Sequence, residues 1–155
     1  MKNLFILLSL LISVTLQAAE IPNFWIRNLD GERFDTRRLN GRPFVVSFFF
    51  VACVPCRKEI PELYSYMKES HPETPLLFIN PIKEDNEVDI ARFSEVLGVP
   101  RSHFYRDSFS AVSRKFFSRE KIGFPTIIGG RDGKQLFRFP GLPEGALDTI
   151  RKELK

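Results

Sequence analysis

Hydrophobic positions along the chain follow two patterns, continuous runs and helical spacing. Residues 43–51, PFVVSFFFV, are apolar or aromatic at nearly every position, which predicts a strand buried on both faces. Residues 75–82, PLLFINPI, predict a second buried strand in the same way. Between these runs, apolar residues recur at helical spacing, so we expect a helix that begins close to Cys53 and ends before Pro72.

The remaining elements are shorter. Residues 24–35, FWIRNLDGERFD, contain two half-apolar runs around Asp30 and Gly31, which predicts a hairpin-like stretch. Residues 124–139 predict a β-hairpin with its turn at Asp132 and Gly133. Helical patterns cover residues 89–99, closed by Gly98, and residues 111–117 and 144–155. This order predicts an α/β fold with a mixed central sheet and helices on both faces.

The first residues have the three-part layout of an export signal. Lys2 is followed by an apolar run over residues 4–16 and by the small residues Ala18 and Ala19. The run is short for a membrane span, which needs about 20 apolar residues. We therefore expect residues 1–19 to be a signal peptide, cleaved near Ala18 or Ala19, and residues 20–155 to form one periplasmic or extracytoplasmic domain. An uncleaved membrane anchor is the alternative.

Charge and cysteine content exclude several classes of function. The formal net charge is only +4 and basic residues are interspersed with acidic ones, so we expect no nucleic-acid partner. The two cysteines, Cys53 and Cys56, are too few for a disulfide-stapled scaffold. A zinc site would need two more ligands, and the only histidines, His71 and His103, do not form a spaced pair. The place of the cysteines between a strand and a helix also argues against a purely structural disulfide, so we expect redox chemistry without metal or cofactor.

The CVPC spacing supplies what disulfide exchange requires. A thiolate must attack, and a second thiol must lie within reach to resolve the mixed disulfide. Unpaired N–H groups at the start of the helix would stabilise the thiolate of Cys53, which makes it the nucleophile. Cys56 follows one helical turn later and is the resolving thiol. Pro55 is tolerated in a first helical turn and stiffens the pair, whereas Val54 is the tuning position.

The chain resembles the thioredoxin superfamily, and within it the TlpA/ResA-like group of exported thiol:disulfide oxidoreductases. The resemblance rests on LDGERFDTRRLNGRPFVVSFFF over residues 29–50, the CVPC pair before a helix, Pro61, and the late FPT followed by a hairpin. It implies a thioredoxin-like fold with an N-terminal extension. It also implies a cis bond at Pro125 beside the cysteines, with Phe124 and Pro125, together with Val54 and Pro55, contacting substrate.

Three positions depart from the family pattern. Ala52 stands where relatives usually place tryptophan, and Ser47 stands where cytosolic thioredoxins carry a buried acid. TlpA/ResA-like reductants often have a glutamate just after the second core strand. Glu84 is nearest to that place, although Lys83 or Asp85 could match it instead. The resemblance therefore suggests Glu84 as the general base toward Cys56.

The leading interpretation is an enzyme that reduces disulfides of exported client proteins, such as apocytochrome c or a metallochaperone. Its expected partners are these cysteine-containing clients and an upstream membrane thiol reductase, and we expect a monomer. A copper-binding assembly chaperone is an alternative, but it would need wider cysteine spacing and a distant ligating histidine. A redoxin-type peroxidase is another, but it would carry threonine where this chain has Phe50. The direction of electron flow is left open by the sequence.

Overall fold

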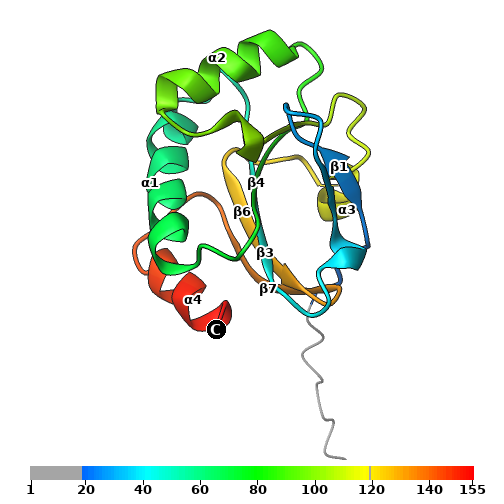
Figure 1. Cartoon of the computed structure of the whole chain (residues 1–155), viewed down its shortest axis with the longest axis vertical. Helices are drawn as coiled ribbons and strands as arrows, with labels where there is room; N and C mark the ends of the chain where they lie inside the picture. Colours follow the sequence, from blue (N-terminus) through cyan, green and yellow to red (C-terminus); the bar gives the residue numbers. More distant parts are fainter. Residues whose placement is uncertain (1–18, 119) are drawn as a thin grey trace, which may run out of the picture.

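Five strands form a mixed central sheet in the order β5-β4-β3-β6-β7 (Figure 1). The structure is a computed structural model that describes residues 19–118 and 120–155. The strands are β3 (Phe44–Phe48), β4 (Leu76–Asn80), β5 (Phe104–Arg106), β6 (Thr126–Arg131) and β7 (Lys134–Phe139). β3, β4 and β5 are parallel, whereas β6 and β7 are antiparallel to their neighbours. The predicted α/β fold with a mixed sheet is therefore confirmed.

The central strand β3 is buried on both faces, as its continuous apolar run predicts. Its side chains alternate between two core clusters on opposite sides of the sheet. Val45 packs into the cluster that contains the apolar faces of helices, and Val46 and Phe48 pack into the cluster on the other side. The sheet is thus the shared wall of both halves of the core.

Helices α1 (Val54–Ser70), α2 (Glu87–Leu97) and α4 (Ala146–Glu153) pack on one face of the sheet (Figure 1). The opposite face is covered by α3 (Ser113–Phe117) and by a separate hairpin, β1 (Trp25–Arg27) with β2 (Arg33–Asp35). Short 3-10 turns follow β2 (η1, Thr36–Arg38) and precede β5 (η2, Arg101–His103). Within the part of the chain that the structure describes, no helix has the length and apolar character needed to cross a membrane.

Local capping explains where the first two helices begin. The side chain of Cys53 is the N-cap of α1, which confirms the predicted start. The side chain of Asn86 accepts hydrogen bonds from the N–H groups of Val88 and Asp89, so α2 begins two residues earlier than its apolar pattern indicates. Gly98 ends α2 in the left-handed conformation, at φ 65°.

Strand β5 was not predicted from the sequence. It is three residues long, and its register with β4 pairs Phe78 with Phe104. An isolated bridge between Asn28 and Tyr105 then joins the N-terminal hairpin to this strand. The predicted hairpin over residues 24–35 is confirmed by the pairing of β1 with β2.

The start of the described chain lies against the far edge of the sheet. Glu20 forms an isolated bridge with Lys134, the first residue of β7. The export signal expected over residues 1–19 falls almost wholly outside the described residues, so it stays a prediction.

Candidate active site

The cysteine pair and the Phe124–Pro125 segment lie at one end of the central strands of the sheet. Because β3, β4 and β5 are parallel, their carboxyl ends all lie at this end of the sheet. Cys53 and Cys56 follow the end of β3, and Pro125 immediately precedes β6, which pairs antiparallel with β3. In open α/β sheets, the carboxyl ends of the strands are where sites are usually built. The topology therefore brings together two motifs that are about seventy residues apart in the chain.

Cys53 and Cys56 form a disulfide, with their Cα atoms 5.3 Å apart. The sulfur of Cys53 also accepts a hydrogen bond from the main-chain N–H of Cys56 at 3.3 Å. Cys53 has an exposed fraction of 2% and Cys56 of 0%, whereas Val54 between them is 76% exposed. The pair thus sits at the N-terminus of α1 with Val54 as its outward-facing neighbour, and Pro55 is exposed beside it.

The peptide bond between Phe124 and Pro125 is cis, as the resemblance implies. Phe124 is partly buried, and its ring meets that of Phe50 edge-on at a centroid distance of 5.2 Å. Phe50 lies three residues before Cys53, so this contact joins the segment before β6 to the turn that carries the cysteines. The hydroxyl of Thr126 donates to the carbonyl of Gly123 at 2.7 Å and closes the turn around the proline. A substrate-binding role for Phe124 and Pro125 stays a prediction.

Asp85 holds the turn before the cysteines in place. Its Oδ2 atom accepts hydrogen bonds from the main-chain N–H of Val51 at 2.8 Å and from the side-chain amide of Asn80 at 2.7 Å. Val51 is two residues before Cys53, so the loop after β4 is tied directly to the active-site turn. The neighbouring Glu84 is exposed, and among the described residues it has no hydrogen bond or ion pair. Its role as general base therefore stays a prediction without a supporting contact.

Glu59 is a second carboxylate near the pair, and the sequence reasoning missed it. It follows Cys56 by three residues in α1, and residues at this spacing share one face of a helix. Its Oε2 accepts a hydrogen bond from the N–H of Leu142 at 2.9 Å. Gly141 lies so close that a Cβ atom there would be 2.9 Å from the same oxygen. Burial raises the pKa of Glu59, although the Leu142 N–H opposes the shift.

The departures from the family pattern have clear structural settings. Ser47 is buried within β3, in the position where a cytosolic thioredoxin would place its acid, so a hydroxyl replaces a carboxyl there. Ala52 is exposed directly before Cys53. Arg57 donates to the carbonyl of Val51 at 3.4 Å, and its guanidinium lies 5.8 Å from the ring centroid of Phe93. Its side chain therefore turns back along the active-site turn.

Both histidines lie at the opposite end of the sheet, where the parallel strands begin. His103 immediately precedes β5, and its Nδ1 atom lies 3.0 Å from the carbonyl oxygen of Leu76, the first residue of β4. His71 follows the C-terminal end of α1, whose N-terminus carries the cysteines. A copper site that combines the cysteine pair with a distant histidine is therefore disfavoured by the topology.

Comparison with known proteins agrees with this geometry. The chain is 34% identical over 73 residues to thiol-disulfide oxidoreductase ResA of Bacillus thuringiensis (strain Al Hakam), a match that covers 46% of this chain and 40% of the relative. A ResA of Bacillus cereus is 35% identical over 54 residues, covering 35% of this chain and 29% of the relative. The matches thus span less than half of the relatives' length. No protein-family model matches the chain.

Solved structures show the same fold. A thiol:disulfide interchange protein from Chlorobium tepidum TLS superposes with a TM-score of 0.70 at 18% identity, covering 89% of this chain and 94% of that one. StoA from Bacillus subtilis superposes with a TM-score of 0.69 at 20% identity, covering 88% of this chain and 99% of that one.

The sheet order, the cysteine pair at the start of α1 and the cis bond before β6 belong to a thioredoxin-like fold, the fold that these solved structures share. Over 54 to 73 residues its sequence is similar to that of the ResA thiol-disulfide oxidoreductases.

Proposed function

We propose that this chain is an exported thiol:disulfide oxidoreductase that exchanges disulfides through Cys53 and Cys56. The observation that carries the proposal is the placement of the sulfur of Cys53 at the N-cap of α1, paired with Cys56 one turn later. After reduction, the N–H groups of the first helical turn would stabilise a thiolate on Cys53. Export rests on the signal-like pattern of residues 1–19.

The exchange proceeds in two balanced steps. The Cys53 thiolate attacks one sulfur of a client disulfide, so a Cys53–client bond forms and the other client sulfur leaves as a thiolate. Cys56, after losing its proton, attacks the sulfur of Cys53 and releases the second client thiolate. The client gains two electrons and the cysteine pair becomes the disulfide seen in the structure. Protons from water or a nearby acid complete the client thiols.

Glu59 is a candidate, beside Glu84, for the carboxylate that accepts the proton of Cys56. It lies one turn from Cys56 in the same helix, and burial raises its pKa. We expect Glu59→Gln to flatten the pH dependence of the resolving step, measured by stopped-flow release of client. Glu84→Gln is the matched control, because Glu84 is exposed and lacks these contacts. A flattened profile in Glu84→Gln alone would transfer the role to Glu84.

We further propose that the protein acts as a reductant. Its clients would be exported proteins with a cysteine pair, such as apocytochrome c or a metallochaperone, and a membrane thiol reductase would regenerate the dithiol. Val54, Pro55, Phe124 and Pro125 would form the surface that contacts the client, since Val54 is exposed beside the disulfide and Phe124 packs on the active-site turn. We expect the protein to act as a monomer.

The decisive experiment pairs two cysteine variants with a potential measurement. Cys56→Ser should trap a mixed disulfide with a disulfide-bonded client peptide, and Cys53→Ser should trap none; the reverse result would contradict the assigned roles. The reduction potential of the Cys53–Cys56 couple, measured against glutathione, should lie near about −270 mV. A potential near about −120 mV would overturn the reductant direction while leaving exchange itself intact.

A further inference from the structure

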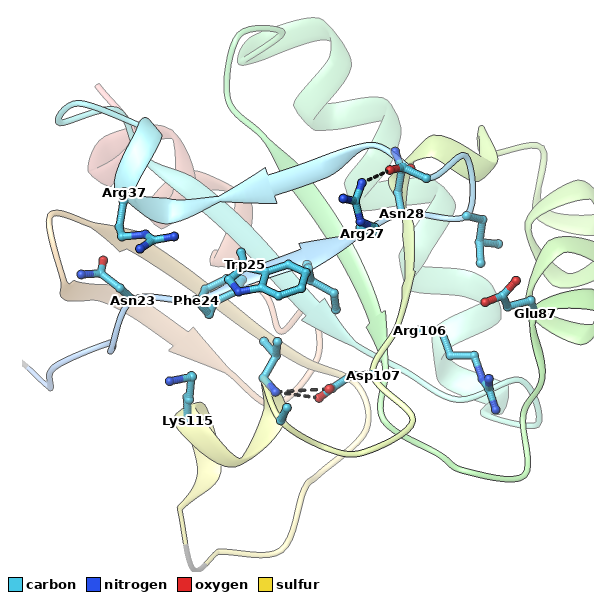
Figure 2. Close-up of a pocket in the computed structure, with 15 residues that line it drawn as sticks. Asn23, Phe24, Trp25, Arg27, Asn28, Arg37, Glu87, Arg106, Asp107 and Lys115 are labelled. Atoms are coloured by element: carbon cyan, nitrogen blue, oxygen red, sulfur yellow. Dashed lines mark hydrogen bonds between the residues drawn. The ribbon is translucent and has the colours of Figure 1, made fainter.

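A groove of about 800 Å³ lies on the hairpin side of the molecule (Figure 2). One wall is the continuous segment of residues 23–29, which contains β1, and the other comes from the end of β5, the following loop and α3. Neither cysteine nor the Phe124–Pro125 segment lines it. Figure 2 shows the indole of Trp25 across the groove, with Lys115 and Arg37 toward one end and Arg106 and Glu87 toward the other. The groove is therefore separate from the disulfide.

The main chain of β1 has a free edge along this groove. Hydrogen-bonded pairs alternate along an antiparallel ladder. The carbonyl of Phe24 accepts from Thr36, and the N–H of Asn28 donates to Glu32, so the even-numbered residues of this segment bond toward β2. Trp25 and Arg27 consequently direct their main-chain groups toward the opposite edge. The Asn28 end of this edge is already occupied by β5, through the bridge between Asn28 and Tyr105 and the hydrogen bond from the Leu29 N–H to the Phe104 carbonyl at 3.0 Å. The Trp25 end has no neighbouring strand among the described residues.

Cationic side chains line the groove, and three of them form no ion pair with a carboxylate among the described residues. The guanidinium of Arg27 donates to the carbonyl of Gly31 at 2.7 Å, and that of Arg106 donates to the carbonyl of Asp85 at 2.9 Å. Carbonyl acceptors hold a guanidinium in place without neutralising it. Lys115 has no ion pair within the described part of the chain. Arg27 and Arg106 are thus held in place by carbonyl oxygens, and neither they nor Lys115 has a carboxylate partner among the described residues.

The other charged residues do not balance these cations. Arg37 is already paired with Asp35 at 2.8 Å. Asp107 is buried, and its carboxylate accepts hydrogen bonds from the N–H groups of Val112 and Ser113. Of the residues that the structure describes, Glu87 is the one further acid that lines the groove. The lining of the groove as a whole therefore carries more positive than negative side chains.

We propose that this groove binds an extended, acidic segment of a partner polypeptide, which adds as a strand to the free edge of β1. Strand addition uses exposed main-chain groups for affinity and alternate side chains for specificity. The uncompensated cations select glutamate or aspartate on the added strand. The guanidinium of Arg33 lies over the Trp25 ring at 4.6 Å, and the rest of this indole, which is 52% exposed, offers an aromatic surface for the partner's apolar or aliphatic atoms. A second copy of this chain is a poor occupant, because it would bring the same cations face to face.

The chain provides its own reporter for this site. Trp25 is the only tryptophan, so its fluorescence reads the groove directly. The probe is an acetylated eight-residue peptide in which glutamate and threonine alternate. The peptide should shift the Trp25 emission in a saturable manner. Its affinity should fall about tenfold when lysine replaces glutamate or when alternate amides are N-methylated. Binding should weaken as salt rises, and should persist in Cys53→Ser, because the site is independent of disulfide exchange.

Matched variants test the cations. Arg27→Gln with Lys115→Gln should weaken binding about tenfold, whereas Arg92→Gln with Lys152→Gln, two exposed cations on α2 and α4, should leave it unchanged. Circular dichroism and urea unfolding confirm that each variant is folded. The proposal is overturned by an unchanged emission up to about 1 mM peptide, by equal affinity for the lysine or N-methylated peptide, or by equal losses in both double variants. Tighter binding of a DNA duplex or of anionic phosphatidylglycerol vesicles than of the peptide would overturn the assignment to a polypeptide.

Discussion

The contact of Asp85 with the active-site turn gives a sharp prediction. Replacing Asp85 by alanine removes the oxygen that accepts from both the Val51 N–H and the Asn80 amide. The two donors are then left with water as their only replacement partner, in a partly buried site. The turn that leads into Cys53 loses its link to the loop after β4. Both the free energy of unfolding and the rate of disulfide exchange should therefore fall.

The size of the effect follows from the two hydrogen bonds. A hydrogen bond to a charged group contributes about 1.5–3 kcal/mol net. The two bonds of Asp85 share one oxygen, and the side chain is partly exposed, so their contributions are not fully additive. We expect Asp85→Ala to lower the free energy of unfolding by about 2–4 kcal/mol. With a urea m-value of about 2 kcal/mol/M, the unfolding midpoint falls by about 1–2 M.

The assay is urea unfolding of the oxidised protein, followed by circular dichroism at neutral pH. Glu84→Ala is the matched control, because it removes the adjacent negative charge from an exposed side chain without hydrogen-bond partners among the described residues. A midpoint for Asp85→Ala within about 0.3 M of that control would refute the reasoning, since such a shift is below the contribution of even one charged hydrogen bond. The rate of disulfide exchange should also drop in Asp85→Ala and not in the control.

Three further substitutions test the core and the hairpin. The hydrogen bond from Arg37 holds the pKa of Asp35 well below its usual range. The ionised carboxylate therefore stabilises the fold at pH values above the ordinary aspartate pKa of about 3.9, and this stabilisation is lost as the pH falls below it. The stability difference between wild type and Asp35→Asn, measured by urea unfolding, should shrink from pH 6 to pH 2. Gly129→Ala places a Cβ atom in steric clash with one side of the Phe137 ring and should cost about 1–3 kcal/mol, read as a lower melting temperature. Phe49→Ala empties a fully buried site and should cost about 3–5 kcal/mol, read from the urea midpoint.

Each of these outcomes has a contrary result. A difference between wild type and Asp35→Asn that does not change with pH would show that the ion pair does not stabilise the fold. An unchanged melting temperature in Gly129→Ala would show that the Phe137 ring moves aside without cost. Phe49→Leu is the control for the third substitution, because it keeps most of the apolar volume; a loss as large as that of Phe49→Ala would place the effect in the aromatic contacts with Phe93 and Phe104 and not in the cavity.

The main strands and helices could be predicted because their signals are long. β3 and β4 are continuous apolar runs, and α1 carries apolar residues at helical spacing between Ile60 and Met67. β5 could not be predicted, since three residues are too few to show a period. Its existence depends on the pairing of Phe104 with Phe78, a contact between segments that only the fold brings together.

The candidate site divides in the same way. Cys53, Cys56 and Pro125 belong to local motifs, and the structure places both motifs at one end of the sheet. The link from Asp85 to Val51 spans 34 residues and has no local signature. Glu59 was visible as a residue three positions after Cys56, but its partner Leu142 lies 83 residues away. Sequence spacing could suggest that carboxylate, whereas only the packed structure shows why its proton affinity rises.

The burial of the disulfide has a consequence for which thiols it can meet. Both sulfurs belong to the packed interior, and Val54 is the part of the pair that faces outward. A thiol must approach nearly in line with the sulfur–sulfur bond to break it, so a cysteine fixed on a rigid convex surface is held too far away. A cysteine on a flexible segment can instead be brought into line with the bond. If the pair exchanges disulfides as proposed, a cysteine in a flexible segment would react with it faster than the same cysteine on a rigid surface.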